Sequence, residues 1–161
     1  MYNNILVPLD GSELAECVFP HVDKFIASGQ VHTVALVRVV EPAPTRFDDT
    51  AALSSKTRDQ IIEGARIIEE DRQARAAEYL KAAGGRLKRD GVIIKTEVLC
   101  GRVADCLVDF IEANGVDLII IATHGRSGIS RWVRGSVADR ILRFSRIPVL
   151  MVQAGWAKGQ K

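Results

Sequence analysis

Five short apolar runs alternate with stretches of helical periodicity, and this alternation constrains the fold more than any other feature. The predicted strands are Asn4 to Leu9, Val34 to Val40, Ile93 to Leu99, Leu118 to Ala122 and Val149 to Val152. Val34 to Val40 is β-branched and almost continuously apolar, as is typical of a strand buried on both faces of a parallel sheet. The order of elements predicts an α/β fold with a Rossmann-like, open, five-stranded and mainly parallel sheet that carries helices on both faces.

Apolar residues recur at helical spacing between the predicted strands. The expected helices are one that contains Leu14, Val18, Val22 and Phe25, a long one from Asp59 to Arg89, and shorter ones over Val103 to Ala113 and Ser136 to Phe144. Gly84-Gly85 costs roughly 1 kcal/mol per glycine inside the long helix, so a break there is the competing interpretation. Gly91 is the better C-terminal stop, and Pro42 to Ser55 is expected to be an exposed loop.

Length and composition indicate one folded domain. The chain has 161 residues, of which 47% are hydrophobic and 26% charged, so we expect a single domain over residues 1–153 and a short tail over 154–161. The apolar runs are far shorter than the roughly 20 residues of a membrane-spanning helix, and the N-terminus does not resemble a signal peptide. A net charge of +2 does not suggest a nucleic-acid partner. We therefore expect a cytoplasmic protein that binds neither membranes nor nucleic acid.

The cysteines and histidines show no metal-binding or disulfide pattern. They are scattered, without a CxxC pair or metal-ligand spacing, at Cys17, Cys100, Cys106, His21, His32 and His124. We expect reduced, partly buried thiols and no metal site.

Two segments that leave predicted strands carry residues suited to ligand binding, because ligands of open parallel sheets collect at the carboxyl ends of strands. In Pro8-Leu9-Asp10-Gly11-Ser12, the Asp10 carboxylate could accept hydrogen bonds from a sugar hydroxyl, or could simply form an Asx-turn. In ATHGRSGISRWVRGS, residues 122–136, Gly135-Ser136 opens a helix whose free N–H groups favour an anion. Ser136 also fits a helix N-cap.

Arginines accompany this second segment. Arg126, Arg131 and Arg134 add positive charge beside the predicted anion site, although surface arginines are more often solvated than bound to phosphate. Trp132, between them, is more typical of a packing anchor than of a base-stacking platform. The arginines strengthen the interpretation of a phosphate loop without proving it.

Three segments of the chain together resemble a known protein family. DLIIIATHGRSGISRWVRGSVADRILRFSRIPVLMV, NILVPLDGSELAE and LCGRVADCLVDFIEANGVD together resemble the universal stress protein family over nearly the whole chain. The resemblance implies an adenine nucleotide alpha-hydrolase-like fold and the ATP-binding subclass, whose members carry Gly, two residues, Gly, nine residues, and Gly followed by Ser or Thr. Here Gly125 takes the second position and Gly135-Ser136 the last two. Ala122 stands at the first position, where its methyl group could crowd a nucleotide.

The same resemblance assigns roles to individual residues. Asp10 would contact the ribose or adenine, the backbone around Val39 would meet the adenine, and Pro8 and Leu9 would line the base pocket. Gly125, Gly135, Ser136 and Val137 would hold the phosphates, with Arg126 nearby. The implied ligand is ATP, with or without Mg²⁺, and the implied assembly is a homodimer in which the strand Val149 to Val152 pairs with its copy.

Other chemistries lack their signatures. GRSG at residues 125–128 is not the GxSxG of an α/β-hydrolase, and the chain has no GxxxxGK[ST] phosphate loop and no HxGH signature of related nucleotidyl-transferring enzymes. No second acid or base is arranged with His124. Two hypotheses remain: a nucleotide-binding stress or signalling protein with at most slow ATP hydrolysis, or a dimeric interaction module of the same fold that binds no nucleotide.

Overall fold

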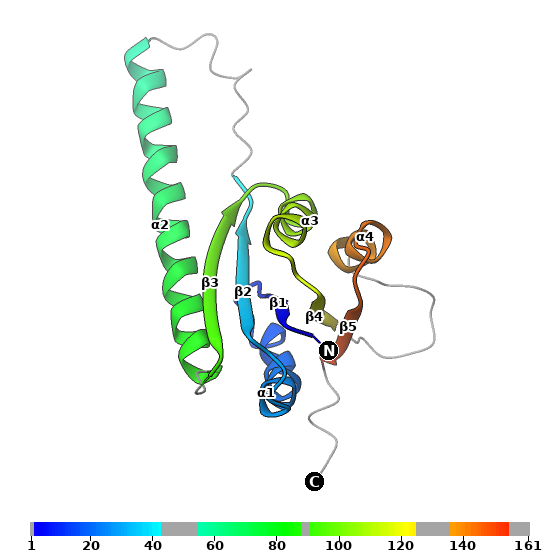
Figure 1. The fold of residues 1–161 in the computed structure, drawn as a ribbon. Coiled ribbons are helices and arrows are strands. Elements are labelled where there is room, and N and C mark those ends of the chain that lie inside the picture. The colour runs from blue at the N-terminus through cyan, green and yellow to red at the C-terminus, as the bar shows by residue number, and fades with distance from the viewer. Residues whose placement is uncertain (1, 43–54, 88–90, 125–135, 155–161) are drawn as a thin grey trace.

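The computed structural model describes residues 2–42, 55–87, 91–124 and 136–154. Five strands and their helices follow one another along the chain (Figure 1). The bounds are β1 Asn4–Pro8, η1 Ala15–Val18, α1 Phe19–Ala27, β2 Thr33–Val40, α2 Ser55–Leu87, β3 Ile93–Cys100, α3 Val103–Asn114, β4 Leu118–His124, α4 Ser136–Phe144 and β5 Val149–Ala154. In this part of the chain, none of the helices combines the length and apolarity needed to cross a membrane.

All four neighbouring strand pairs are parallel, and the strand order is β3-β2-β1-β4-β5. The predicted five-stranded α/β fold is confirmed. Each ladder places strand ends in line: β1 pairs with β2 as far as Pro8 and Val37, and β4 pairs with β5 as far as His124 and Ala154. The carboxyl ends of the strands therefore meet at one edge of the sheet, as the sequence predicts.

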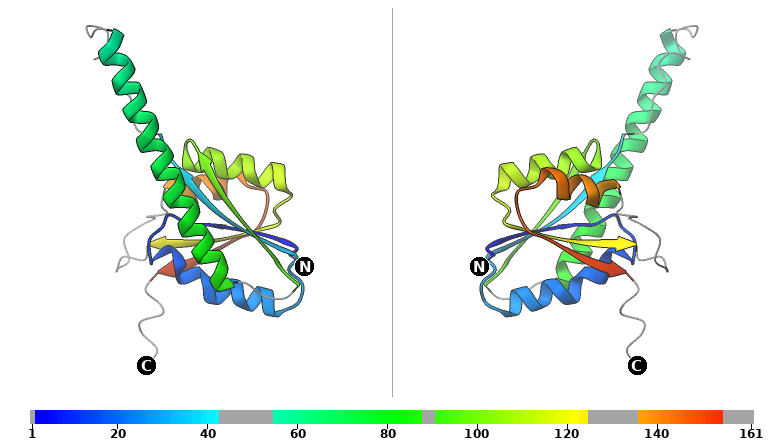
Figure 2. Two further views of the ribbon diagram at one scale, coloured as in Figure 1. Left: turned by 90° about the vertical axis from the view of Figure 1, so that its left-hand side faces the viewer. Right: turned by 90° about the vertical axis from the view of Figure 1, so that its right-hand side faces the viewer.

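Helices cover both faces of the sheet (Figures 1 and 2). On one face η1, α1 and the C-terminal half of α2 pack on residues such as Val34, Leu36 and Ile120. On the other face α3 and α4 pack on Ala35, Val37 and their neighbours in β1 and β4. β-Branched and leucine side chains point alternately to the two faces, so burial on both sides explains the continuous apolar runs.

The expected first helix is divided into two pieces. η1 is a single 3-10 turn, and the α-helix begins only at Phe19 with Pro20 in its first turn. A proline at this position has no N–H to donate and its ring clashes with a carbonyl four residues earlier, so a continuous α-helix through Leu14 is disfavoured. The correction moves Leu14 out of the helix and into the loop that leaves β1.

α2 runs without a break through Gly84-Gly85, so the alternative of a break is wrong for this helix. A β-carbon at Gly84 would lie 3.2 Å from Cγ2 of Ile94 and 3.4 Å from Cγ2 of Thr96, which shows that the glycine lets the helix approach β3 closely. The helix starts at Ser55, four residues earlier than expected. Its predicted end at Arg89 lies outside the described residues.

α2 has two halves with different surroundings. All of its buried side chains lie between Ala76 and Leu87, in the half that we call the base, residues 73–87. The preceding half, residues 56–72, has no buried residue and projects beyond the sheet (Figure 2). We call this half the arm.

Candidate functional site

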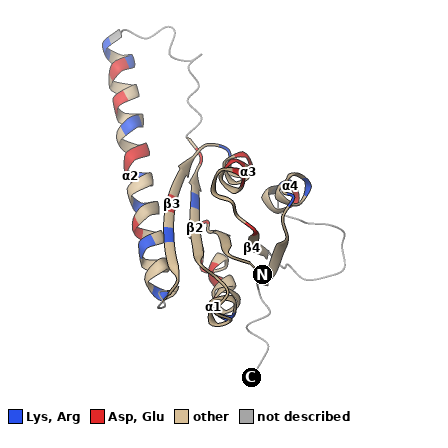
Figure 3. Cartoon of the chain, in the orientation of Figure 1, with Lys and Arg blue, Asp and Glu red and all other residues tan. Residues whose placement is uncertain are grey.

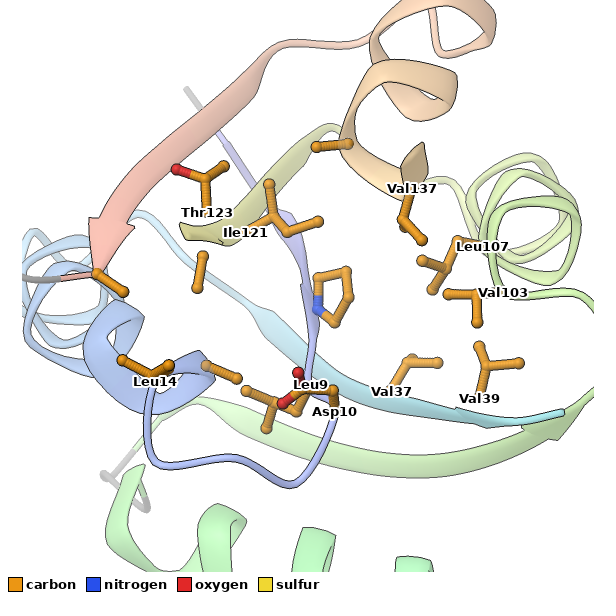
Figure 4. Close-up of a pocket in the computed structure, with 15 residues that line it drawn as sticks. Leu9, Asp10, Leu14, Val37, Val39, Val103, Leu107, Ile121, Thr123 and Val137 are labelled. Atoms are coloured by element: carbon orange, nitrogen blue, oxygen red, sulfur yellow. The ribbon is translucent and has the colours of Figure 1, made fainter. Parts of the chain in front are cut away.

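A cavity of about 450 Å³ opens at the carboxyl ends of β1, β2 and β4 (Figure 4). Most of its wall is apolar. The described residues that line it are Pro8, Leu9, Asp10, Leu14, Ala15, Val37, Val39, Val103, Leu107, Ile121, Ala122, Thr123, Val137, Ala138 and Ala154. Asp10 is the one ionisable side chain among these residues, and Thr123 contributes a hydroxyl. Such a wall suits a flat, largely apolar group, with a hydrogen-bond acceptor at the rim.

The cavity forms where the strand order reverses. β1 lies between β2 and β4. From β1 the chain continues to β2 and β3 on one side, and from β4 it continues to β5 on the other side. The register joins β1 to β4 at Ile5 with Leu118 and at Leu6 with Ile119, whereas it joins β1 to β2 as far as Pro8. A crevice of this kind is the usual ligand position in open α/β sheets. The topology therefore places the cavity independently of any motif.

Backbone and side-chain hydrogen bonds fix the loop that carries Asp10. The N–H of Leu9 donates to the carbonyl of Val37 at 2.8 Å, and the N–H of Ser12 donates to Oδ1 of Asp10 at 2.8 Å. Ser12 Oγ in turn accepts from the N–H of Ala15 at 3.1 Å. The Asx-turn considered from the sequence is thus present, and one Asp10 oxygen has a structural role.

Arg38 and Tyr79, on the face of the sheet that α2 covers, support the loop that carries Asp10. Gly11 has a φ of +87°, and a β-carbon there would lie 2.8 Å from Nη1 of Arg38. The Arg38 guanidinium also lies over the ring of Tyr79 in α2, 5.4 Å from its centroid. A side chain at Gly11 would be strained and would displace Arg38, so glycine is required in this turn.

Glu16 joins η1 to α2 through a two-fold ion pair. Its carboxylate accepts hydrogen bonds from Arg86 at 2.7 and 2.9 Å, and these bonds lower the pKa of Glu16. Burial and the negative charge of Glu16 raise the pKa of Tyr79 to about 12. Tyr79 therefore stays a neutral phenol, and a charged pair and a half-buried ring together hold the loop.

Two helices begin beside the cavity. Val137 and Ala138 from the first turn of α4 and Val103 from the first turn of α3 line its wall. An ion pair of 2.5 Å between Arg140 and Asp105 joins the two helices. Free N–H groups and the positive end of the helix dipole are found at such termini, so this side of the cavity favours an anionic group.

Six residues predicted from the sequence line the same cavity: Pro8, Leu9, Asp10, Val39, Ala122 and Val137. Ser136 is the first residue of α4, next to Val137. Gly125, Arg126 and Gly135, predicted to hold phosphates, lie outside the described residues, as do Arg131, Trp132 and Arg134. The structure thus brings together the predicted base-pocket residues and the start of the helix after the predicted phosphate loop.

Sequence reasoning missed several lining residues. Leu14 and Ala15 come from the loop and turn after β1, and Leu107 comes from the second turn of α3. A signal for Leu107 was present in the sequence, because Val103 begins the helix after β3 and Leu107 lies one helical turn later on the same side. Ala154 lies beyond the predicted end of the last strand, and the pairing of His124 with Ala154 explains why the strand continues.

The cysteines are not arranged as a reactive centre. All three are free, and burial raises the pKa of Cys17 and, with help from Asp109 and Asp105, that of Cys106. Within the described residues, no group of three or more His, Cys, Asp or Glu side chains could hold a metal ion.

Comparisons with known proteins agree with the fold. The model of the universal stress protein family matches residues 1–153, and the chain belongs to this family. It is 29% identical to the universal stress protein MJ0531 of Methanocaldococcus jannaschii over 95% of this chain and 83% of that one. The solved structure of MJ0577 from the same organism has a TM-score of 0.73 at 25% identity and covers 95% of this chain and 96% of its own.

One further structure has the same fold. A universal stress protein solved in complex with cAMP has a TM-score of 0.62 at 21% identity, over 96% of this chain and 98% of that one. This likeness concerns the fold alone.

Proposed function

We propose that this universal stress protein binds ATP, with or without Mg²⁺, and acts in a stress response or in signalling with at most slow ATP hydrolysis. The observation that carries the proposal is the convergence of Pro8, Leu9, Asp10, Val39, Ala122 and Val137 on one apolar cavity at the sheet's reversal point. The adenine lies in this cavity, and Asp10 accepts a hydrogen bond from the ribose or the base. That a related structure holds cAMP supports an adenine nucleotide as the ligand.

In this proposal the phosphates lie at the start of α4. Val137 from its first turn lines the cavity, and free N–H groups at a helix N-terminus favour anions. The sequence motif assigns Gly125, Gly135 and Ser136 to the same group, with Arg126 nearby. The triphosphate then continues from the cavity toward residues 125–136.

Release of bound nucleotide is the direct test. Purified protein is denatured and the supernatant is analysed by chromatography for adenine nucleotides, and calorimetry measures ATP binding by the nucleotide-free protein. Gly135→Val should remove binding, because a branched side chain blocks the close approach of phosphate to the backbone. If calorimetry shows no ATP binding to the unmodified protein, the ATP proposal is abandoned.

Two substitutions at Asp10 separate its structural role from its role in binding. Asp10→Asn keeps an oxygen that can accept the N–H of Ser12, whereas Asp10→Ala removes the Asx-turn as well. If the charge accepts a ligand hydroxyl, Asp10→Asn weakens ATP binding about tenfold while the thermal midpoint stays near that of the unmodified protein. Unchanged affinity in Asp10→Asn assigns the side chain to the turn alone.

Ala122 is the departure from the family motif, and it can be tested in both directions. Its side chain is half-buried at the cavity wall in β4. Ala122→Gly should tighten ATP binding if the methyl group crowds the nucleotide, and Ala122→Leu should prevent binding by filling the space. Equal affinities in all three proteins would show that this position does not touch the ligand.

We also propose a homodimer in which Val149 to Val152 pairs with its copy. β5 is an edge strand of the sheet, and Met151 on it is 43% exposed. An uncovered apolar edge favours pairing with another strand. In sedimentation, the double variant Val149→Lys and Met151→Lys should lose the association through β5. Met151→Lys alone is the less disruptive variant. Association as strong in both variants as in the unmodified protein excludes the interface.

A second function has one observation in its favour. Ala122 replaces the first motif glycine, and a member of the fold without nucleotide binding would serve as a dimeric interaction module. The calorimetric experiment separates the two, since an interaction module dimerises normally without binding ATP.

A further inference from the structure

The arm of α2 has an apolar face that no other part of the described residues covers. Ile61, Ile62, Ile67 and Ile68 are 44%, 54%, 55% and 60% exposed, although isoleucine is among the most buried residue types. Since seven residues complete about two turns, Ile61 and Ile68 lie on one face of the helix. Gly64 and Ala65 lie between them on that face, flanked by Thr57 and Arg72.

The opposite side of the arm is charged. Arg66 pairs with Glu63 at 2.7 Å and with Glu70 at 2.5 Å, and all three side chains are more than half exposed. Figure 3 shows charged residues of both signs along this part of α2. The arm is therefore amphipathic, with a solvated charged side and an apolar face that the described residues do not cover.

Packing among the described residues does not explain Gly64. A β-carbon at Gly64 would meet no atom of these residues within 4 Å, unlike one at Gly84, which would press against β3. A glycine inside a helix costs about 1 kcal/mol relative to alanine. Small residues at the centre of an apolar helix face allow a second helix to approach closely, because interaxial distance depends on the side chains at the contact.

The segment Ile61 to Ile68, IIEGARII, has the same pattern in both directions. Reversal about its midpoint exchanges Ile61 with Ile68 and Gly64 with Ala65, which are the four residues of the exposed face. A two-fold interface needs a surface that complements its own reversed copy. From the exposed face and this symmetry, we infer that the arm pairs in an antiparallel manner with the arm of a second copy of this chain.

Charge complementarity favours the antiparallel orientation. Lys56 and Arg58 lie near the N-terminal end of the arm. Glu69, Glu70 and Asp71, which pair within α2 with Arg72, Arg66 and Arg75, lie near its junction with the base. Antiparallel pairing brings the basic end of each arm beside the acidic end of the other, whereas parallel pairing brings Lys56 and Arg58 against their own copies. This contact uses neither the cavity nor β5, so it is independent of nucleotide binding and of the proposed strand pairing.

Sedimentation in a Met151→Lys background isolates the arm contact from pairing through β5. We expect association that depends on protein concentration, and Ile61→Glu with Ile68→Glu should abolish it. Ile67→Glu is the matched control, because Ile67 is equally apolar and exposed but lies roughly 100° around the helix from Ile68. Association that persists in the double variant, or that is lost to the same degree in the control, overturns the proposal.

Disulfide trapping tests the orientation in the folded protein. In the antiparallel pair Ile61 faces Ile68 of the other copy, while the two copies of residue 61 are about 10 Å apart along the helix. Under mild oxidation, Ile61→Cys mixed with Ile68→Cys should give at least several times more cross-linked dimer than either variant alone. Equal yields in the mixture and in the single variants contradict antiparallel pairing, and the unmodified protein under the same oxidation controls for Cys17, Cys100 and Cys106.

Discussion

The two halves of α2 are parts of one helix, yet they meet opposite environments. In the base, Leu80 and Ala83 are fully buried on the sheet and Gly84 lies against Ile94. In the arm, isoleucines of the same apolar character remain exposed, and no atom of the described residues would lie within 4 Å of a β-carbon at Gly64. Helical periodicity in the sequence therefore indicates which face of a helix is apolar. Whether that face stabilises the fold depends on the tertiary contacts that it makes.

Leu80→Ala should cause the largest loss of stability among substitutions in α2. Leu80 is 0% exposed and lies in the core with Leu36 and Ile120, so its truncation leaves a cavity. We expect unfolding in denaturant to show a loss of about 2–5 kcal/mol. Ile68→Ala in the arm is the control and should cost far less, because Ile68 already contacts water. Similar losses at the two positions would mean that the arm is packed in solution.

The glycines of the two halves should respond in opposite ways to the same substitution. Gly84→Leu forces a side chain into the contact with Ile94 and should destabilise the protein by about 1–3 kcal/mol. Gly64→Leu adds a side chain where no atom of the described part of the chain lies within 4 Å, and it raises helix propensity by up to about 1 kcal/mol. Thermal unfolding in dilute solution distinguishes them, and a loss at Gly64 comparable with that at Gly84 would remove the contrast.

The sequence predicted the layered fold because its signals are local. Continuous apolar runs such as Val34 to Val40 indicate strands buried on both faces, and the alternation with helices implies parallel connections. The order of the strands and the uncovered arm depend on packing between distant segments. Gly84 shows the limit clearly, since a glycine that permits close packing against Ile94 has the same sequence signal as one that breaks a helix.

For the candidate site, sequence reasoning found the residues at strand ends and missed those that packing brings to them. Asp10, Val39 and Ala122 were accessible to prediction because parallel strands end at one edge of the sheet. Leu14 and Leu107 reach the same cavity from a turn and from a helix, at positions set by how these elements pack over the sheet. Pro20 also shifted the helix start, which local periodicity around Leu14 and Val18 did not reveal.

The ion pair at the base should contribute a small, pH-dependent stability. Because Arg86 lowers the pKa of Glu16, the contribution is complete above the ordinary carboxyl pKa of 4.5 and is lost as pH falls through the lowered pKa. Arg86 is 54% exposed, so solvent screening limits the contribution to about 1 kcal/mol or less. Glu16→Gln should therefore destabilise the protein at pH 7 and match the unmodified protein below the lowered pKa. A difference that is constant with pH would assign the effect to packing instead.

The ion pairs of the arm should have the smallest effect of all. Arg66, Glu63 and Glu70 are each more than half exposed, and exposed ion pairs of this kind are screened by water and salt. Arg66→Gln should leave the denaturant midpoint of the whole protein unchanged at neutral pH, while a small decrease in helical circular dichroism reports local fraying of the arm. We expect unfolding of the base and the sheet to be independent of Arg66. A shift of the global midpoint would show instead that the two halves of α2 unfold as one cooperative unit, although only the base is buried.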